Sequence, residues 1–402
     1  MALIAKGLRG LFLGLFGTFT LFGISMTIVG AALPKILGDF KWGYVPTGAV
    51  LAASAGAYFL SSLFAGRLLD RIGSKATIIT GLSACVAGLA FFASTPSILA
   101  NFLLNALIGA GQGLIEPTVN WAALRMDQDS TSRPMNLMHG AFAIGAVAGP
   151  IFLVLILATG LSWTLLFRAI SALFGLLGLI LAVMPFSKLG STVQDNRSGQ
   201  AQARLRKKPA YWLGFASLLL YVGAELGISN WIAEYFVRIF SADPAFASLT
   251  VSLFWIGLLA GRFGVPALYR GKRQELVLVL SSLLLVAATT SLCVLGFAAR
   301  GGRAALFVPA AITFLTGLGC SIIYPTVISL VGISCAEAQA EAISFAVAGG
   351  GVGLFSFPFI MSWISQGFGI KVGFASYALV AALTATSCAI LARVFSRARM
   401  SA

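Results

Sequence analysis

Long apolar stretches dominate the chain, and short polar segments separate them. The stretches are continuous and rich in Leu, Ala, Gly and Phe, whereas the strands of a membrane barrel alternate apolar and polar residues over about ten positions. A helix needs about 20 apolar residues to cross a hydrocarbon core of about 30 Å. The pattern therefore predicts twelve membrane-spanning helices, near 9–33, 46–69, 76–95, 98–124, 135–158, 163–187, 211–240, 247–269, 274–298, 304–333, 340–365 and 372–395.

Composition supports the same class of protein. Of the 402 residues, 59% are hydrophobic and 10% are charged, whereas soluble domains have about 45–50% and about 25%. A soluble enzyme is therefore excluded, and we expect an integral, multi-pass membrane protein that is not an enzyme. The five cysteines lie in or beside apolar spans without metal-like spacing, so we expect buried thiols and no disulfide.

The net charge of +15 could suggest a nucleic-acid partner, but the positions of the 27 Lys and Arg indicate topology instead. If the N-terminus is cytoplasmic, most of these residues fall in or beside cytoplasmic connections, as the positive-inside rule predicts. We therefore expect both termini in the cytoplasm, a bacterial-type inner membrane and no nucleic-acid partner. The short basic N-terminus leads into a first span too long for a signal peptide, which predicts an uncleaved first helix.

One long polar stretch predicts a cytoplasmic linker at 188–208 between two six-helix bundles, 1–187 and 209–402. Its basic end, from Arg204 to Lys208, is interpreted as a topology determinant. Contact with anionic lipid head groups is the alternative.

An internal repeat relates the two predicted bundles. Glycines and prolines of one segment return 208 residues later: Gly111 and Gly319, Pro117 and Pro325, Gly145 and Gly353, and Pro150 and Pro358. The second copy has Tyr324 in place of Glu116 and Val347 in place of His139. One architecture has been duplicated, and ionisable groups remain in one copy of this helix pair.

Two carboxyl groups, those of Glu116 and Glu225, lie deep within predicted spans. A charged carboxylate at mid-membrane costs at least about 2.5 kcal/mol, so such a residue usually faces a cavity or a partner. Burial without a cation favours the protonated form, which suits a site that loads and releases a proton. We predict that both residues couple transport to protons. The alternative for Glu116 is a protonated side chain that holds helix packing through one hydrogen bond.

Polar residues accompany these acids. Asn120 follows Glu116 by four positions and shares its helix face, and Pro117 is expected to kink the helix. His139, the only histidine, could relay a proton or bind a ligand, or it could be a neutral packing residue. No further His or Cys ligands are apparent beside it, so no metal site is predicted.

The segment from Glu225 to Tyr235 carries Asn230 and Trp231, polar and stacking groups of the kind that hold sugars. Anchoring of Trp231 and Tyr235 at the membrane interface explains the aromatic residues equally well. The candidate substrate contacts are Gln112, Asn120, Asn136, Asn230, Trp231 and Tyr324, and His139 and Glu225, which are predicted to couple transport to protons, are further candidates.

A charged connection follows the second span and contains Gly66, Asp70, Arg71 and Gly73. We predict that these four residues form a conformational latch, in which Asp70 pairs with basic groups or a helix N-terminus of the other bundle. The alternative is an ordinary short loop with positive-inside charge, which leaves Asp70 unexplained.

This connection resembles the loop between helices two and three of the major facilitator superfamily. Gly-Leu-Ile-Glu116-Pro-Thr-Val-Asn120, Asn136-Leu-x-His139 and Tyr-Val-Gly-x-Glu225 further resemble the fucose permease branch and its glucose-transporting relatives. The resemblance implies two parallel six-helix bundles with substrate held at their interface, near the midplane of the membrane. The first helix carries no acid in its interior, so a mechanism with a pair of acids in the N-terminal half is not implied.

The sequence thus predicts a secondary active transporter with the all-α major facilitator fold, working by alternating access. We expect it to move a small hydroxylated solute, such as a monosaccharide, by proton symport as a monomer without a cofactor; sodium is the alternative coupling ion. A proton-driven exporter of hydrophobic or cationic compounds is the first alternative, and a receptor or scaffold that transports nothing is the second. No Gly-x-x-x-x-Gly-Lys-[Ser/Thr] loop is present, so direct ATP drive is not expected.

Overall fold

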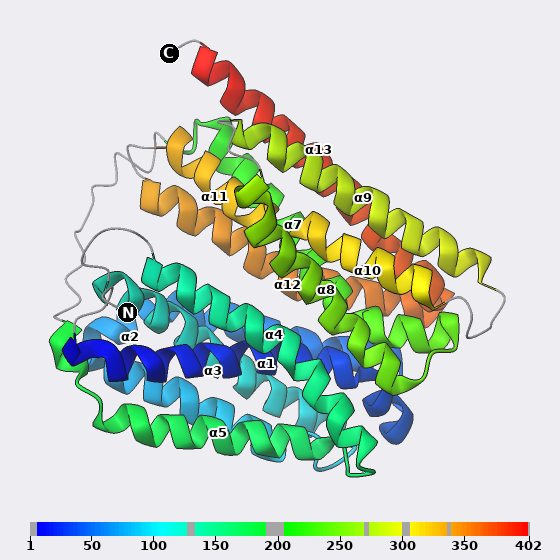
Figure 1. Ribbon diagram of the computed structural model, residues 1–402, viewed down its shortest axis with the longest axis horizontal. Helices are drawn as coiled ribbons and strands as arrows, with labels where there is room; N and C mark the ends of the chain where they lie inside the picture. Colours follow the sequence, from blue (N-terminus) through cyan, green and yellow to red (C-terminus); the bar gives the residue numbers. More distant parts are fainter. Residues whose placement is uncertain are drawn as a thin grey trace. The chain divides into compact units, whose positions relative to one another are not determined.

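The computed structural model describes residues 6–126, 133–189, 205–268, 273–299, 306–335 and 339–400. Within these ranges the chain forms helices and no strands (Figure 1), which confirms the predicted all-α class. The elements are η1 (Lys6–Leu8), α1 (Arg9–Phe40), α2 (Tyr44–Phe91), α3 (Ile98–Met126), α4 (Arg133–Ala158), α5 (Thr164–Val183), η2 (Phe186–Leu189), α7 (Pro209–Phe240), α8 (Pro244–Leu268), α9 (Gln274–Ala298), α10 (Phe307–Cys320), α11 (Ile323–Ser334), α12 (Gln339–Phe368) and α13 (Ile370–Met400).

Eleven helices of the described chain are long and apolar enough to cross a membrane, and α2 accounts for two crossings. At 48 residues α2 is about 72 Å long if straight, more than twice the hydrocarbon thickness. Gly73 interrupts it with φ 80° and ψ 162°, a conformation that favours glycine. The predicted spans near 46–69 and 76–95 are the two arms on either side of Gly73, so the prediction of twelve spans is confirmed.

The predicted span near 304–333 is broken into α10 and α11. The break lies at Ser321 and Ile322, shortly before Pro325. A proline ring collides with the carbonyl of the residue four positions earlier, which here is Ser321. In the first half of the repeat, the residue four positions before Pro117 is Gly113, and α3 continues through the proline.

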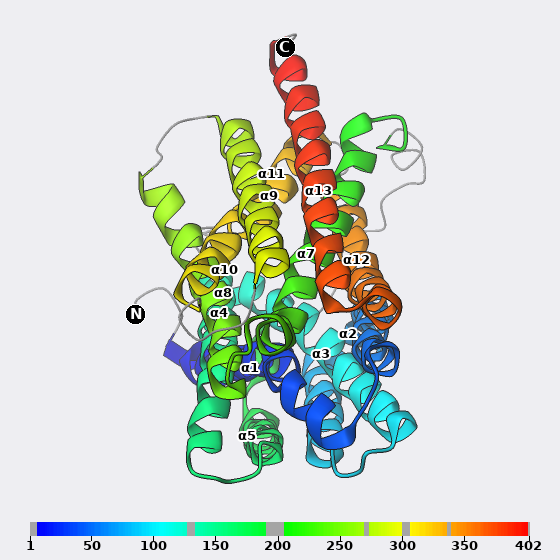
Figure 2. The same cartoon turned by 90° about the vertical axis from the view of Figure 1, so that its right-hand side faces the viewer.

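The described helices fall into two compact units. The first unit contains Met1–Trp42 and Ala49–Asp195, and in it α1 packs chiefly against α4. The second contains Gly43–Gly48 and Asn196–Ala402, and in it α7 lies beside α12 and α13 (Figure 2). Most of the predicted linker lies at 190–204, outside the described residues, so its boundaries stay a prediction.

Helices α1 and α7 show that the two units repeat one design. Each is 32 residues long and ends at a residue in the left-handed region, Lys41 and Ser241, both with φ 53°. The glycines of the repeat also occupy matching places. A Cβ on Gly145 would lie 1.9 Å from the Thr20 carbonyl oxygen, and one on Gly353 would lie 1.9 Å from that of Leu219. Backbones of neighbouring membrane helices approach this closely only where side chains are absent.

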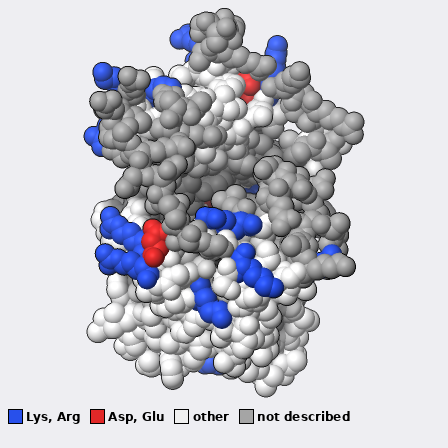
Figure 3. Space-filling view, turned by 90° about the vertical axis from the view of Figure 1, so that its left-hand side faces the viewer, with Lys and Arg blue, Asp and Glu red and all other residues white. Residues whose placement is uncertain are grey.

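The surface of the described chain suits a lipid environment. Large apolar side chains point outward, among them Val183 at 81% and Leu268 at 90% exposed. The face shown in Figure 3 carries several Lys and Arg side chains and few Asp and Glu. All five cysteines are buried and free, as expected.

The glycine contacts generate a matched pair of variants. Gly145→Ala should lower the melting temperature in detergent, because the new methyl group collides with the α1 backbone and overpacking of this kind costs about 1–3 kcal/mol. Gly140→Ala on the same helix is the control, since its Cβ meets no atom within 4 Å. Equal melting temperatures for the two variants would contradict the described packing of α1 on α4.

Candidate functional site

Three candidate residues follow one face of α3 in the first unit. Gln112, Glu116 and Asn120 are spaced by four positions, so their side chains stack along the helix. Gln112 is buried and donates from Nε2 to the Ser25 hydroxyl of α1 at 2.8 Å. The Asn120 Oδ1 atom is buried and has no hydrogen-bond partner in the described chain. On this face Glu116 therefore lies between Gln112, whose amide is hydrogen-bonded, and Asn120, whose amide oxygen is bonded to none of the described residues.

The carboxyl of Glu116 has a specific partner on α2, because the Tyr58 hydroxyl donates to its Oε2 atom. The contact depends on a glycine: a Cβ on Gly113 would lie 2.3 Å from the Tyr58 carbonyl oxygen. Only a residue without a side chain lets α3 approach α2 this closely, which brings the acid to the tyrosine. Glu116 is partly exposed and, within the described residues, forms no ion pair.

His139 lies on α4 in an aromatic environment. Its ring meets Phe19 of α1 edge to face, with ring centroids 5.7 Å apart. Phe142, one turn further along α4, packs against Phe22 at 5.4 Å. Asn136 also lies on α4, but its side chain is outside the described set, so its predicted contact with substrate stays a prediction.

The second unit holds its own buried acid, Glu225 of α7, which is 6% exposed. Tyr221 lies one turn before this acid on the same face of α7, and its hydroxyl donates to the Cys320 carbonyl oxygen at 3.0 Å. Arg262 of α8 interacts electrostatically with the carboxyl and donates from Nε to the Ser321 carbonyl oxygen at 3.4 Å.

Tyr324 stands at the position that corresponds to Glu116 in the internal repeat. Its ring packs against Tyr221, with centroids 6.5 Å apart. The second unit thus has a tyrosine where the first has an acid. Its own acid, Glu225, lies on α7 one turn from Tyr221, whose ring packs against Tyr324.

The remaining α7 candidates differ in burial. Asn230 is partly exposed, whereas Trp231 is fully buried and its Nε1 has no hydrogen-bond partner among the described residues. The Trp231 ring meets Tyr44 edge to face at 5.7 Å. A buried indole N–H without an acceptor is uncommon in native structures and calls for an explanation.

The predicted latch residues lie on the surface around the break in α2. Gly66, Asp70, Arg71 and Gly73 are all exposed. Lys75, which follows them, donates to the Ala182 carbonyl oxygen near the end of α5 at 2.6 Å. That bond caps a helix within the first unit. The latch itself stays a prediction.

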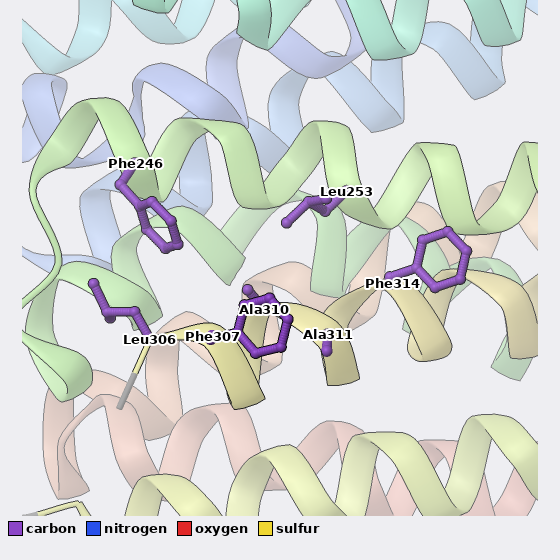
Figure 4. Close-up of a pocket in the computed structure, with 7 residues that line it drawn as sticks. All are labelled: Phe246, Leu253, Leu306, Phe307, Ala310, Ala311 and Phe314. Atoms are coloured by element: carbon purple, nitrogen blue, oxygen red, sulfur yellow. The ribbon is translucent and has the colours of Figure 1, made fainter. Parts of the chain in front are cut away.

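A cavity of about 340 Å³ lies between α8 and α10 (Figure 4). It is lined by Phe246, Leu253, Leu306, Phe307, Ala310, Ala311 and Phe314. No polar side chain lines it, and Phe307 is 82% exposed at its edge. The cavity therefore suits a hydrocarbon chain and does not suit a hydroxylated solute. Among the described residues, no group of three or more His, Cys, Asp or Glu side chains could hold a metal ion.

Two partners of the acids were missed in the sequence, Tyr58 and Arg262. Tyr58 is a single phenol in an apolar span, and nothing in its neighbourhood indicates that it reaches another helix. Arg262 follows a glycine in a degenerate copy of the segment that contains Arg67, which suggests a loop charge rather than a partner for Glu225. Both contacts depend on how neighbouring helices are rotated.

The helices and their buried acids define a multi-pass membrane transporter. The chain belongs to the Major Facilitator Superfamily, whose family model matches residues 15–310. Membership of this superfamily confirms the predicted fold and the prediction of a transporter rather than an enzyme.

Several known proteins are similar to this chain. It is 26% identical over 386 residues to the glucose/galactose transporter of Brucella abortus, covering 89% of this chain and 88% of that one. It is 24% identical over 272 residues to Bypass of stop codon protein 6 of Saccharomyces cerevisiae, covering 61% of this chain and 54% of that protein. Among solved structures, the E. coli fucose:proton symporter FucP aligns over 96% of this chain and 99% of its own, with a TM-score of 0.64 and 22% identity.

The contact between Tyr58 and Glu116 can be measured by a double-mutant cycle. Tyr58→Phe should lower the free energy of unfolding in mixed micelles by more in the wild-type background than in a Glu116→Met background, because the methionine offers the hydroxyl no acceptor. The expected coupling is about 1 kcal/mol, as for a hydrogen bond between neutral groups. Losses that add within about 0.5 kcal/mol would contradict the contact.

Proposed function

We propose that this protein is a proton-coupled secondary transporter of a small hydroxylated solute, such as a monosaccharide, working by alternating access. The observation that carries the proposal is the Glu116 carboxyl, which lies partly exposed within a membrane-spanning helix and, among the described residues, has a hydroxyl and no cation as its partner. A carboxyl within the membrane costs free energy, and an apolar residue would pack there without that cost, so packing alone does not explain Glu116.

Coupling follows from what the carboxyl offers in its two states. Ionised Glu116 accepts hydrogen bonds, including the one from Tyr58, whereas protonated Glu116 can also donate one. A solute hydroxyl on the same face therefore meets a different partner in each state. If the two states bind solute with different affinity, solute binding changes proton binding by the same factor.

The choice of a sugar rests on chemistry and on relatives. The Asn120 Oδ1 and the Trp231 Nε1 are a buried acceptor and a buried donor that have no hydrogen-bond partner among the described residues, and hydroxyl groups can satisfy both kinds. The similar protein of Brucella abortus is named a glucose/galactose transporter, and FucP is named a fucose:proton symporter. Candidate contacts are Gln112, Asn120, Asn136, His139, Asn230, Trp231 and Tyr324, with Glu225 as a second proton-binding group.

Charge distribution supports the orientation. We propose that the protein lies in a bacterial inner membrane with both termini in the cytoplasm, an orientation that the positive-inside rule favours. We propose that the monomer is the working unit and that Gly66, Asp70, Arg71 and Gly73 act as a latch on the cytoplasmic side.

A proton-driven exporter of hydrophobic compounds is the second candidate. The aromatic cluster of Phe19, Phe22 and Phe142 beside His139 favours it, because such a surface binds apolar solutes. A thermal-shift screen of sugars, amino acids, organic acids and lipophilic cations separates the two functions, since a ligand that binds the native state raises its melting temperature.

The coupling role of Glu116 is tested in proteoliposomes. Glu116→Gln should abolish sugar uptake driven by a pH gradient while sparing counterflow, because the amide cannot bind or release a proton but keeps the size and polarity of the side chain.

The control is Glu275→Gln, which removes an acid from the first turn of α9 and should leave both activities unchanged. Uptake driven by the pH gradient in Glu116→Gln would remove this residue from the coupling role.

A further inference from the structure

The first turn of α2 is held by helices of the second unit. Residues Gly43–Gly48 belong to that unit, whereas the rest of α2 belongs to the first. The first N–H groups of a helix have no partners within the helix itself. Here Gln366 of α12 supplies one, because its Oε1 accepts from the Tyr44 amide at 2.8 Å and from the Val45 amide at 3.4 Å.

Close packing on α12 reinforces this cap. A Cβ on Gly48 would lie 1.9 Å from the Ser362 Oγ and 2.5 Å from its Cβ. Glycine is therefore required for the first turn to rest against α12 at this distance.

Tyr44 covers a buried acid on α7. Its hydroxyl donates to the Glu234 Oε1 at 3.3 Å, and the Arg238 Nε donates to the same oxygen at 2.7 Å. The ring of Tyr44 meets Trp231 edge to face at 5.7 Å. Trp231 and Glu234 are three residues apart and share a face of α7, so one tyrosine covers both.

This arrangement leaves two polar atoms unsatisfied. The Glu234 Oε2 and the Trp231 Nε1 are buried, both residues are 0% exposed, and neither atom has a hydrogen-bond partner within the described chain. Buried polar groups without partners are costly and uncommon. While Tyr44 packs on α7, the Glu234 Oε1 is hydrogen-bonded but the Glu234 Oε2 and the Trp231 Nε1 are not bonded to any described residue. This favours the replacement of Tyr44 by a group that bonds to these atoms.

A sugar has the groups that these two unpaired atoms require. A carboxylate oxygen accepts from a hydroxyl, an indole N–H donates to one, and the Trp231 ring offers an apolar surface. We infer that Trp231 and Glu234 form a binding subsite for a hydroxylated solute, which Tyr44 occupies until the first turn of α2 is released. Solute and Tyr44 compete for this subsite, so solute binding favours release. This inference rests on the proposed function.

Hydrogen exchange of the peptide that spans 43–48 reports the release, because the Tyr44 and Val45 amides lose their acceptor when the turn leaves. In the purified full-length protein, D-galactose or D-glucose should speed exchange of this peptide. Glycine betaine at equal concentration, which has no hydroxyl groups, should not. A sugar that is transported but leaves the exchange unchanged or slower overturns the inference.

Two variants separate the roles of Tyr44 and Trp231. Tyr44→Phe loses the bond to Glu234, so exchange of 43–48 should rise without sugar and the apparent Kd for sugar should fall roughly twofold to tenfold, about the worth of one hydrogen bond. Trp231→Phe keeps a ring against Tyr44 but has no N–H, so exchange without sugar should stay as in the wild type while the response to sugar is lost. Thr80→Ala removes a hydroxyl that bonds only within α2 and is the control, expected to change neither measurement.

A pair of uncharged substitutions distinguishes loss of this packing contact from misfolding. Gly48→Ala should speed exchange of 43–48 because its methyl group meets Ser362, and Gly48→Ala with Ser362→Gly should restore slow exchange. If Tyr44→Phe and Gly48→Ala both exchange as the wild type does, the first turn is not held as described and the inference is wrong whether or not sugar is the solute. If the wild type neither binds nor transports any sugar while these two variants exchange faster, the proposed function fails, and so does the assignment of the subsite to a hydroxylated solute.

Discussion

The contact between the Glu116 carboxyl and the Tyr58 hydroxyl constrains the rest of the first unit. A carboxyl inside a membrane-spanning helix needs a hydrogen-bond partner there, because lipid offers none. That partner is within reach because Gly113 lets α3 lie against the backbone of Tyr58. The continuity of α3 through Pro117 then carries Asn120 to the same face as the acid. Helix packing and site chemistry are thus consequences of one set of close helix contacts.

The second unit meets the same constraint with different residues. Its glycines repeat the close approach, as Gly353 on Leu219 matches Gly145 on Thr20. Its acid, however, lies on α7, where Glu225 follows Tyr221 by one turn and interacts electrostatically with Arg262. Duplication therefore preserved the packing of the backbone and left each unit free to place its ionisable group on a different helix. Within the described part of the chain, a cation acts on Glu225 and none on Glu116, so the two acids have different electrostatic surroundings.

The sequence predicts the fold well because lipid imposes a simple rule on length and hydropathy. Spans, the break at Gly73 and the matching glycines can all be read from apolar runs and repeated small residues. The site is predicted in part: Glu116 and Glu225 stand out as acids in apolar spans, but Tyr58 and Arg262 do not stand out as their partners. Those contacts depend on helix rotation, which composition does not specify. The role of Gln366 as a cap for another helix is equally invisible, since the two residues it bonds lie more than 300 positions away.

The central claim is that solute binding and the protonation of Glu116 depend on each other. The most direct measurement is the infrared difference spectrum of the reconstituted protein with and without sugar. The account predicts a change in the carbonyl band of a protonated carboxyl on sugar binding, and the loss of that change in Glu116→Gln while sugar still binds. A spectrum without any carboxyl change in the wild type, at saturating sugar, would contradict it.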